Sequence, residues 1–210
     1  MAKLDGWFVV LAFVTAHAGA ADLFNGRDFA GWELVTTPGA AIADVLANLP
    51  QGVIAVAGQP AGFFATVASY RNYRLHVEWR WSAKPGNAGV LLHISPGPMD
   101  RVWPLSLQVQ TRHGNAGDLL PMAGASFAEA LTSAAGAPVA VKARIAPDSE
   151  TPAGQWNTCD IVARDGGVEL RINGVLQNTA SNVKPSFGRI GFQLEGAAYE
   201  LRRVALAPLD

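Results

Sequence analysis

Hydrophobic and polar residues alternate with a period of two over much of the chain, and residues 73–81 show this most clearly. Every second side chain in this stretch is aromatic or aliphatic, namely Tyr73, Leu75, Val77, Trp79 and Trp81. The side chains between them are polar, namely Arg74, His76, Glu78 and Arg80. Because successive side chains of a strand point to opposite faces, the pattern predicts a strand with its aromatic face in a core. Glu78 and Arg80 should face away from that core.

Similar alternation recurs along the chain and predicts an antiparallel β-sandwich. The further predicted strands are residues 88–94, 106–112, 139–145, 158–164, 168–173, 189–195 and 199–206. Asp165-Gly166-Gly167 and Asn173-Gly174 provide the positive backbone angles of tight hairpins, so three consecutive strands should form a meander. A length of 210 residues is compatible with one all-β domain.

Two stretches depart from this alternation and predict short helices on the rim of the sandwich. Residues 40–49 place four aliphatic side chains at helical spacing, namely Ile42, Val45, Leu46 and Leu49. Residues 126–134 begin with Ser126 as a helix cap and carry Glu129 three positions later, as in a capping box.

The first 21 residues have the pattern of a secretory signal peptide. Lys3 precedes an apolar run over residues 7–14, and a small-residue segment containing Ala18, Gly19 and Ala20 follows it. A short membrane anchor is the alternative, although the run has about half of the ~20 apolar residues that a spanning helix needs. We expect cleavage after Ala20 or Ala21, a mature domain over residues 22–210, and a periplasmic or secreted protein.

Charge and short motifs exclude several classes of function. The chain has 16 Lys+Arg against 17 Asp+Glu. It therefore lacks the excess of basic residues that nucleic-acid binding requires. The single cysteine, Cys159, excludes an internal disulfide and is predicted to be buried. The chain has no glycine-rich phosphate loop, HExxH, nucleophile elbow or CxxC motif. Any active site must therefore be assembled from separate strands.

The polar face of residues 106–112 is one candidate for such a site. Ser106, Gln108, Gln110 and Arg112 alternate with the predicted buried residues of the strand, and the strand leads into His113 and Asp118. Amide, guanidinium, imidazole and carboxylate groups together suit sugar hydroxyls, which need both donors and acceptors. The alternative is a polar edge followed by a glycine turn.

Other candidates lie at strand ends or on the polar faces of strands. Glu195 follows Gln193 at a predicted strand end, where functional groups tend to lie. The remaining candidates are Asn87 and His93, the row from Arg74 to Arg80, and the indoles of Trp81, Trp103 and Trp156 for stacking on sugar rings. The alternative for the row is solvated sheet surface, and the alternative for His93 is a structural histidine. Trp32 and Trp79 are predicted to be core residues.

Eight segments, in order and over nearly the whole mature chain, resemble the 3-keto-disaccharide hydrolase family. They are LFNGRDFAGW (23–32), YRLHVEWRW (73–81), PGNAGVLLH (85–93), WPLSLQVQ (103–110), HGNAGD (113–118), GQWNTCDI (154–161), LRINGVLQN (170–178) and GRIGFQLEGAAYELRRVALAPL (188–209). The resemblance implies a concanavalin A-like lectin/glucanase jelly roll in an exported bacterial protein that acts on oxidised sugars.

The resemblance also shows one departure from the family pattern. The family commonly has Ser-aliphatic-Glu-Val-Gln where this chain has Ser106–Gln110, so Gln108 replaces a glutamate. An amide does not ionise near neutral pH and brings no negative charge to a cation. The glutamate of the family's Gln-x-Glu-Gly stretch is retained as Glu195, and His113 and Asp118 are also in place.

The resemblance predicts hydrolysis of 3-keto-glycosides. A ketone at carbon 3 acidifies the proton on carbon 2, so one base can start an elimination that water addition completes. We expect Glu195 or His113 as the base, Asp118 orienting His113, and Glu78 as a second carboxylate. The predicted sugar-binding residues are Gln108, Gln110, Arg80, Arg112, Trp103, Asn87, His93 and Gln193.

The same residues are also compatible with a metal ion and with a role in binding alone. A divalent cation could assist at the ketone oxygen. The expected partner is an oligosaccharide or oxidised sugar, with no nucleic acid and no membrane after removal of the leader. The alternatives to an enzyme are a non-catalytic carbohydrate-binding domain, favoured by Gln108, and an interaction domain.

Overall fold

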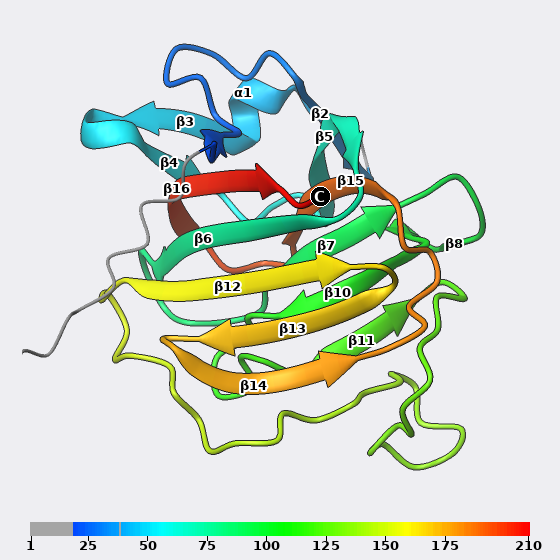
Figure 1. Ribbon diagram of the computed structural model, residues 1–210. Coiled ribbons are helices and arrows are strands. Elements are labelled where there is room, and N and C mark those ends of the chain that lie inside the picture. The colour runs from blue at the N-terminus through cyan, green and yellow to red at the C-terminus, as the bar shows by residue number, and fades with distance from the viewer. Residues whose placement is uncertain (1–18, 38) are drawn as a thin grey trace, which may run out of the picture.

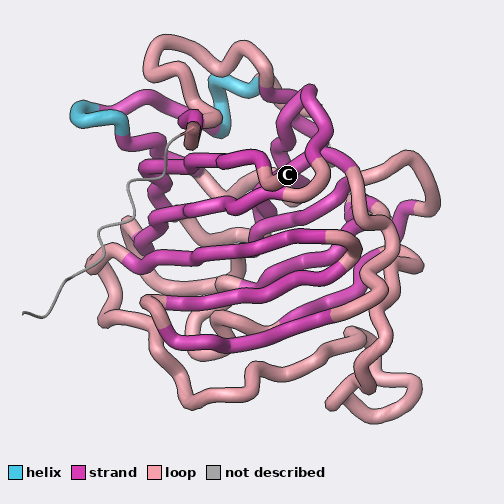
Figure 2. Tube along the Cα trace, viewed as in Figure 1, coloured by secondary structure: helices cyan, strands magenta, loops and turns pink. Residues whose placement is uncertain are grey.

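Two antiparallel sheets stacked face to face form the molecule in the computed structural model, which describes residues 19–37 and 39–210 (Figures 1 and 2). The larger sheet has the order β14-β13-β12-β6-β16-β4-β3, and β1 also pairs with β16. Its strands are β1 (Ala21–Asp22), β3 (Leu46–Leu49), β4 (Val53–Val56), β6 (Tyr73–Trp81), β12 (Asn157–Arg164), β13 (Gly167–Ile172), β14 (Val175–Ala180) and β16 (Tyr199–Pro208). The all-β sandwich is therefore confirmed.

The second sheet has six strands in the order β11-β10-β7-β15-β5-β2 and lies behind the first in Figure 1. Its strands are β2 (Trp32–Thr36), β5 (Gly62–Tyr70), β7 (Gly89–Ile94), β10 (Ser106–Gln110), β11 (Leu119–Met122) and β15 (Gly188–Leu194). A small hairpin of β8 (Met99–Asp100) and β9 (Trp103–Pro104) precedes β10.

The core between the sheets is built by the period-two faces of the strands. In β6, the inward side chains from Tyr73 to Trp81 are all at most 2% exposed, and Trp32 and Cys159 are also buried. In β10, Leu107 and Val109 join the same core cluster. Alternation therefore leaves Ser106, Gln108 and Gln110 on the outer face of the six-stranded sheet.

The predicted meander is present as β12, β13 and β14. Its two hairpin turns contain the pairs Asp165-Gly166 and Asn173-Gly174, and all four residues have positive φ between 50° and 80°. Consecutive positive φ values are typical of the turn that matches the twist of paired strands.

One predicted helix is present but shorter than predicted, and the other predicted helix and one predicted strand are wrong. The first helix is only α1 (Ile42–Val45), because the chain then becomes β3 and pairs with β4 from Leu46 onward. In 126–134 the backbone of Ser126 pairs with Lys184, and Glu129 accepts hydrogen bonds from Ser181. These long-range bonds outweigh a helix of nine residues, which is marginal by itself. Residues 139–145 make one bridge, between Lys142 and Leu119.

The predicted signal peptide lies largely outside the described residues, which include only its last three positions. In the part of the chain that the structure describes, no helix is long and apolar enough to cross a membrane.

Candidate functional site

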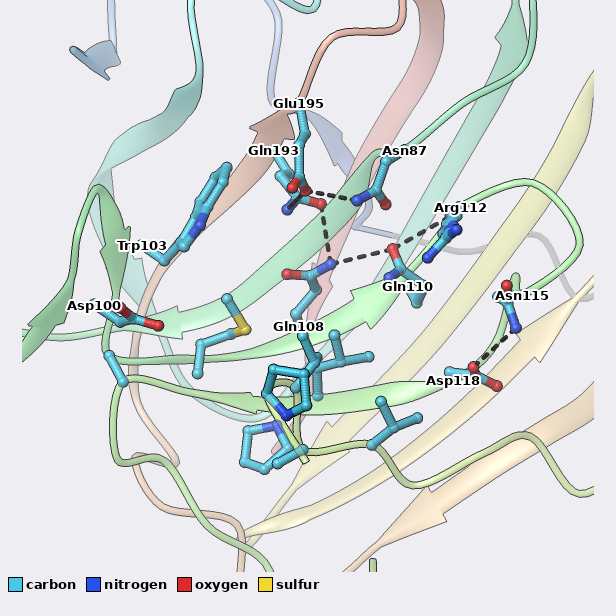
Figure 3. A pocket seen from close by; sticks show the side chains of 18 of the residues that line it. Asn87, Asp100, Trp103, Gln108, Gln110, Arg112, Asn115, Asp118, Gln193 and Glu195 are labelled. Carbon is cyan, nitrogen blue, oxygen red and sulfur yellow. Dashed lines mark hydrogen bonds between the residues drawn. The ribbon is translucent and has the colours of Figure 1, made fainter. Parts of the chain in front are cut away.

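A pocket of about 300 Å³ opens on the outer face of the six-stranded sheet, over β10 and the end of β15 (Figure 3). Eight residues predicted from the sequence line it, namely Asn87, Trp103, Gln108, Gln110, Arg112, Asp118, Gln193 and Glu195. They come from segments far apart in the chain, so the pairing of β10 with β7, and of β7 with β15, brings them together.

Strand β10 supplies the floor of the pocket through its outward side chains. Gln108 and Gln110 are at most 7% exposed, although they point away from the core between the sheets. Gly89, opposite Gln110 in the sheet, leaves the space that Gln108 occupies, because a Cβ there would come within 2.7 Å of Gln108 Nε2. The glycine therefore allows the amide to lie across the strand β7.

Glu195 provides the carboxylate at one end of the pocket. It follows the last residue of β15 and precedes Gly196, whose φ of 96° ends the strand. Its Oε2 accepts hydrogen bonds of 2.6 Å from Asn87 Nδ2 and from Gln193 Nε2. Partial burial raises the pKa of Glu195, and the positive charges of Arg101 and Arg112 offset part of that rise. A carboxylate that has a raised pKa and is held by neutral amides is suited to accepting a proton.

The hairpin β8–β9 carries Trp103 into the pocket and also contributes Asp100 and Arg101. Asp100 and Arg101 were not predicted from the sequence. They belong to a short hairpin inserted before β10, and two-residue strands have no periodicity to reveal them. Figure 3 shows Trp103 on one side of Gln108 and Arg112 on the other.

The remaining wall of the pocket is largely apolar and was also not predicted. It consists of Leu120, Pro121, Met122 and Ala123 from β11 and the following turn, together with Pro138, Val139, Ala140 and Val141. The long segment after β11 reaches the pocket because Lys142 and Leu119 exchange two backbone hydrogen bonds. Such a wall can contact the C–H faces of a sugar ring.

Asp118 and His113 are not arranged as the sequence predicted. Asp118 lines the pocket at a distance from Glu195 (Figure 3), and its carboxylate accepts hydrogen bonds from Arg144 N and Asn115 Nδ2. His113 is outside the pocket lining, and its Nδ1 lies 2.9 Å from Glu150 Oε2. Glu150, not Asp118, therefore orients His113. Glu150 is held in turn by the indole N–H of Trp81.

Glu78 and Arg80 lie on the outer face of the eight-stranded sheet, away from the pocket. Both point away from the core as predicted, yet Glu78 is only 5% exposed because Arg202 and Arg203 pair with it. Arg80 pairs with Glu200 and lies over the ring of Trp156. These contacts make both residues parts of the sheet surface, and the prediction that they belong to the same site as Gln108 is wrong.

His93 is a buried structural residue. Its Nε2 lies 3.1 Å from the hydroxyl of Tyr73, and its Nδ1 lies 3.1 Å from the carbonyl oxygen of Pro185. Burial lowers the pKa of His93 to about 4. The positive φ of 58° at this position turns the side chain out of simple alternation and explains why the predicted outward orientation was wrong.

The three candidate stacking tryptophans occupy different places. Trp103 lines the pocket, whereas Trp81 is buried against Tyr199 in the core. Trp156 is on the opposite sheet, where the guanidinium groups of Arg80 and Arg202 both lie over its ring. Only Trp103 of these three is therefore placed to contact a ligand in the pocket.

Within residues 19–37 and 39–210, no three His, Cys, Asp or Glu side chains are grouped so as to hold a metal ion. A divalent cation at this pocket stays a prediction. Its carboxylate donors would have to come from Glu195, Asp118 or Asp100, which different elements supply.

Solved structures with the same fold include carbohydrate-active proteins. A candidate glycosyl hydrolase from Parabacteroides distasonis ATCC 8503 is similar at 21% identity and a TM-score of 0.66, over 92% of this chain and 95% of that one. A β-glucanase from Bacillus licheniformis has 11% identity and a TM-score of 0.61, over 91% and 99% of the two chains. A carbohydrate-binding module from Bacillus subtilis has 13% identity and a TM-score of 0.57, over 86% and 97%. At these identities the likeness shows the fold alone.

No curated protein matches the sequence significantly. The family model described as the 3-keto-alpha-glucoside-1,2-lyase-like domain matches residues 19–207, which is most of the chain and includes every residue of the pocket. The chain therefore belongs to this family, the 3-keto-disaccharide hydrolases.

Proposed function

We propose that this protein is an exported enzyme that cleaves the glycosidic bond of 3-keto-glycosides by elimination followed by hydration. The observation that carries the proposal is Glu195, a carboxylate in a pocket of sugar size, held by two amides and with a raised pKa. The family's description as lyase-like supports elimination as the first step.

In the first step Glu195 takes the proton from carbon 2 of the keto sugar. The electrons of the C–H bond form an enolate whose negative charge is on the ketone oxygen, where the guanidinium groups of Arg101 and Arg112 provide positive charge. When the enolate collapses, the double bond forms between carbons 1 and 2, and the bond from carbon 1 to the glycosidic oxygen breaks. The departing oxygen takes up a proton from solvent, and the water that adds in the second step returns one proton to solvent.

In the second step water adds across the new double bond. Its hydroxyl joins carbon 1, and a proton returns to carbon 2 from the protonated Glu195. The sum of both steps is hydrolysis, and Glu195 is regenerated. One base suffices because the ketone has already acidified the proton, so a second carboxylate is not required.

The other polar residues of the pocket would bind the sugar. Gln110 and Asn87 present amide groups to its hydroxyls, and Trp103 presents an indole face to its C–H bonds. His113 has no part in this scheme, since it lies outside the pocket lining and pairs with Glu150.

A non-catalytic carbohydrate-binding domain is the second candidate. Gln108 favours it, because an amide in place of the family's usual glutamate leaves one carboxylate fewer in the pocket. Such a domain would bind the keto sugar without releasing its aglycone.

The test is incubation of the purified mature chain with a 3-keto-glucoside and with the parent glucoside, in EDTA and with added divalent cations. We expect cleavage of the keto sugar alone. Binding of the keto sugar without cleavage in either condition would support the binding domain. Dependence on an added cation would place a metal in the reaction.

A further inference from the structure

The amides in the pocket form a chain of hydrogen bonds that runs in one direction (Figure 3). Gln108 Nε2 donates to Gln193 Oε1 at 3.0 Å, and Gln193 Nε2 donates to Glu195 Oε2 at 2.6 Å. Gln108 Nε2 also donates to Gln110 Oε1 at 3.1 Å. Gln193 therefore links Gln108 to Glu195.

The direction of this chain is dictated by Glu195. An ionised carboxylate accepts hydrogen bonds and cannot donate, so Gln193 must turn its Nε2 toward Glu195. The oxygen of the same amide then faces Gln108, which has to be the donor. An ionised carboxylate at position 108 could not make this bond.

A second contact imposes the same requirement independently. Gln110 Oε1 accepts a hydrogen bond of 3.3 Å from the backbone N–H of Arg112, which can only donate. Gln110 therefore presents its oxygen to Gln108 as well. Two acceptors face position 108, and the two protons of one amide nitrogen satisfy both.

This arrangement leaves two buried acceptors free in the pocket. Gln108 Oε1 and Asn87 Oδ1 are both buried, and neither has a partner among the described residues. The nitrogen of Asn87 is committed to Glu195, so its oxygen is the group left for a ligand. Free buried acceptors require donors, and sugar hydroxyls can provide them, whereas a ketone oxygen cannot.

We propose that Gln108 is both a positioning residue and a specificity residue of the site around Glu195. Its nitrogen fixes Gln193 and thereby the orientation of Glu195, and its oxygen, with that of Asn87, accepts hydroxyl groups of the sugar. The ketone then lies toward the guanidinium groups. The part concerning the sugar rests on the proposed function, whereas the part concerning Glu195 does not.

Other charges around the pocket act on the same carboxylate. Arg101 comes from the β8–β9 hairpin and Arg112 follows β10, while Asp100 and Asp118 are the other acidic residues of the lining. The substitutions below leave all four in place. A change in the titration of Glu195 will therefore report on position 108.

The first experiment is an NMR titration of ¹³C-labelled glutamate side chains in the wild type and in Gln108→Glu. We expect the introduced carboxyl to keep its proton, donating it to Gln193, and to titrate at least about one pH unit above an ordinary glutamate. Glu195 should ionise first. An introduced carboxyl that titrates in the ordinary range, with Glu195 unchanged, would overturn the proposal.

Gln177→Glu is the matched control. Gln177 is also a fully buried glutamine with an unpartnered Oε1, but its nitrogen donates to Pro147 and Ser149 outside the pocket. Gln177→Glu should leave the titration of Glu195 unchanged. An equal shift of Glu195 in this control would show a general effect of buried charge and would contradict a specific role for Gln108.

Gln108→Met provides a second variant if Gln108→Glu does not fold. Methionine fills similar space but cannot donate to Gln193, so Glu195 should lose an oriented donor and its titration midpoint should rise. An unchanged midpoint would contradict the positioning role.

The activity readout separates this inference from the proposed function. In Gln108→Glu we expect a new fall of kcat/KM at high pH, where the introduced carboxyl ionises and the amide chain breaks. A uniform loss at every pH would indicate a merely structural role and overturn the proposal. If the wild type has no activity on keto sugars, the proposed function fails, while the NMR titration still decides whether Gln108 positions Glu195.

Discussion

Glu195 and Glu78 are glutamates on opposite outer faces of the sandwich, and their surroundings affect their protons in opposite ways. Glu195 is held by the amides of Asn87 and Gln193, and burial raises its pKa. Burial also acts to raise the pKa of Glu78, but hydrogen bonds from Arg202, Arg203 and His76 outweigh it, so that its pKa is lowered. The number of hydrogen bonds is therefore a poor guide to reactivity. The charge of the donors decides whether a carboxylate can take up a proton.

Glu195→Gln should have the largest effect of the substitutions that distinguish Glu195 from Glu78, and this effect is on catalysis. Removing a general base should lower kcat/KM on a 3-keto-glucoside by about 10²–10⁴-fold. The melting temperature should stay the same or rise. Because the pKa of Glu195 is raised in the folded state, the ionised carboxylate lowers the free energy of unfolding at pH values above that pKa. A neutral glutamine at this position does not lower it. Kinetics and thermal melting at neutral pH would check both expectations.

Glu78→Gln should have the opposite effects. It replaces one of the two acceptor oxygens by a donor and removes the charge that pairs with Arg202 and Arg203. The free energy of unfolding at pH 7 should therefore fall by ~1–3 kcal/mol, with kcat/KM unchanged. Since the pKa of Glu78 is lowered by folding, its stabilising contribution is present above the ordinary pKa of about 4.3 and is lost as the pH falls through the lowered value. Denaturant unfolding as a function of pH would measure this. A loss of activity without a loss of stability would contradict the assignment.

Two tryptophans extend the comparison with a smaller effect. Trp103→Ala should raise KM about two- to tenfold, since a stacking contact contributes ~0.5–1.5 kcal/mol. Trp156→Ala is the matched control on the opposite sheet, where Arg80 and Arg202 lie over the indole. It should leave KM unchanged. Equal changes in KM for both variants would show that ligand binding is not confined to the pocket.

The smallest effect is expected for His113→Ala. The imidazole contacts Glu150 and lies outside the pocket lining, so kcat/KM should change by less than about twofold, well below the contribution of a general base. Steady-state kinetics would check this. A loss of kcat/KM as large as that in Glu195→Gln would assign the role of general base to His113.

The fold could be predicted from the sequence where alternation is strict. The strand β6 was predicted with its bounds, and the meander was predicted from its two turns, because both signals are local. The segments 126–134 and 139–145 were predicted wrongly, since their structure depends on contacts with residues far away in the chain, among them Lys184, Ser181 and Leu119. Local periodicity carries no information about such contacts.

Part of the site could also be predicted from the alternation of residues along the strands. Gln108, Gln193 and Glu195 follow from strand alternation and the position of a strand end, whereas Arg101 and the wall over residues 138–141 depend on how irregular segments fold over the sheet. Glu78 and Arg80 alternate as regularly as Gln108 and Gln110. Only the pairing of strands shows that they belong to the opposite sheet.

The central claim is that Glu195 removes the proton from carbon 2 of a keto sugar. The most direct test follows the exchange of that proton into D₂O by NMR, with a methyl 3-keto-glucoside and either the wild type or Glu195→Gln. We expect exchange well above the buffer rate for the wild type and at the buffer rate for the variant. Equal exchange rates for the two proteins would contradict it.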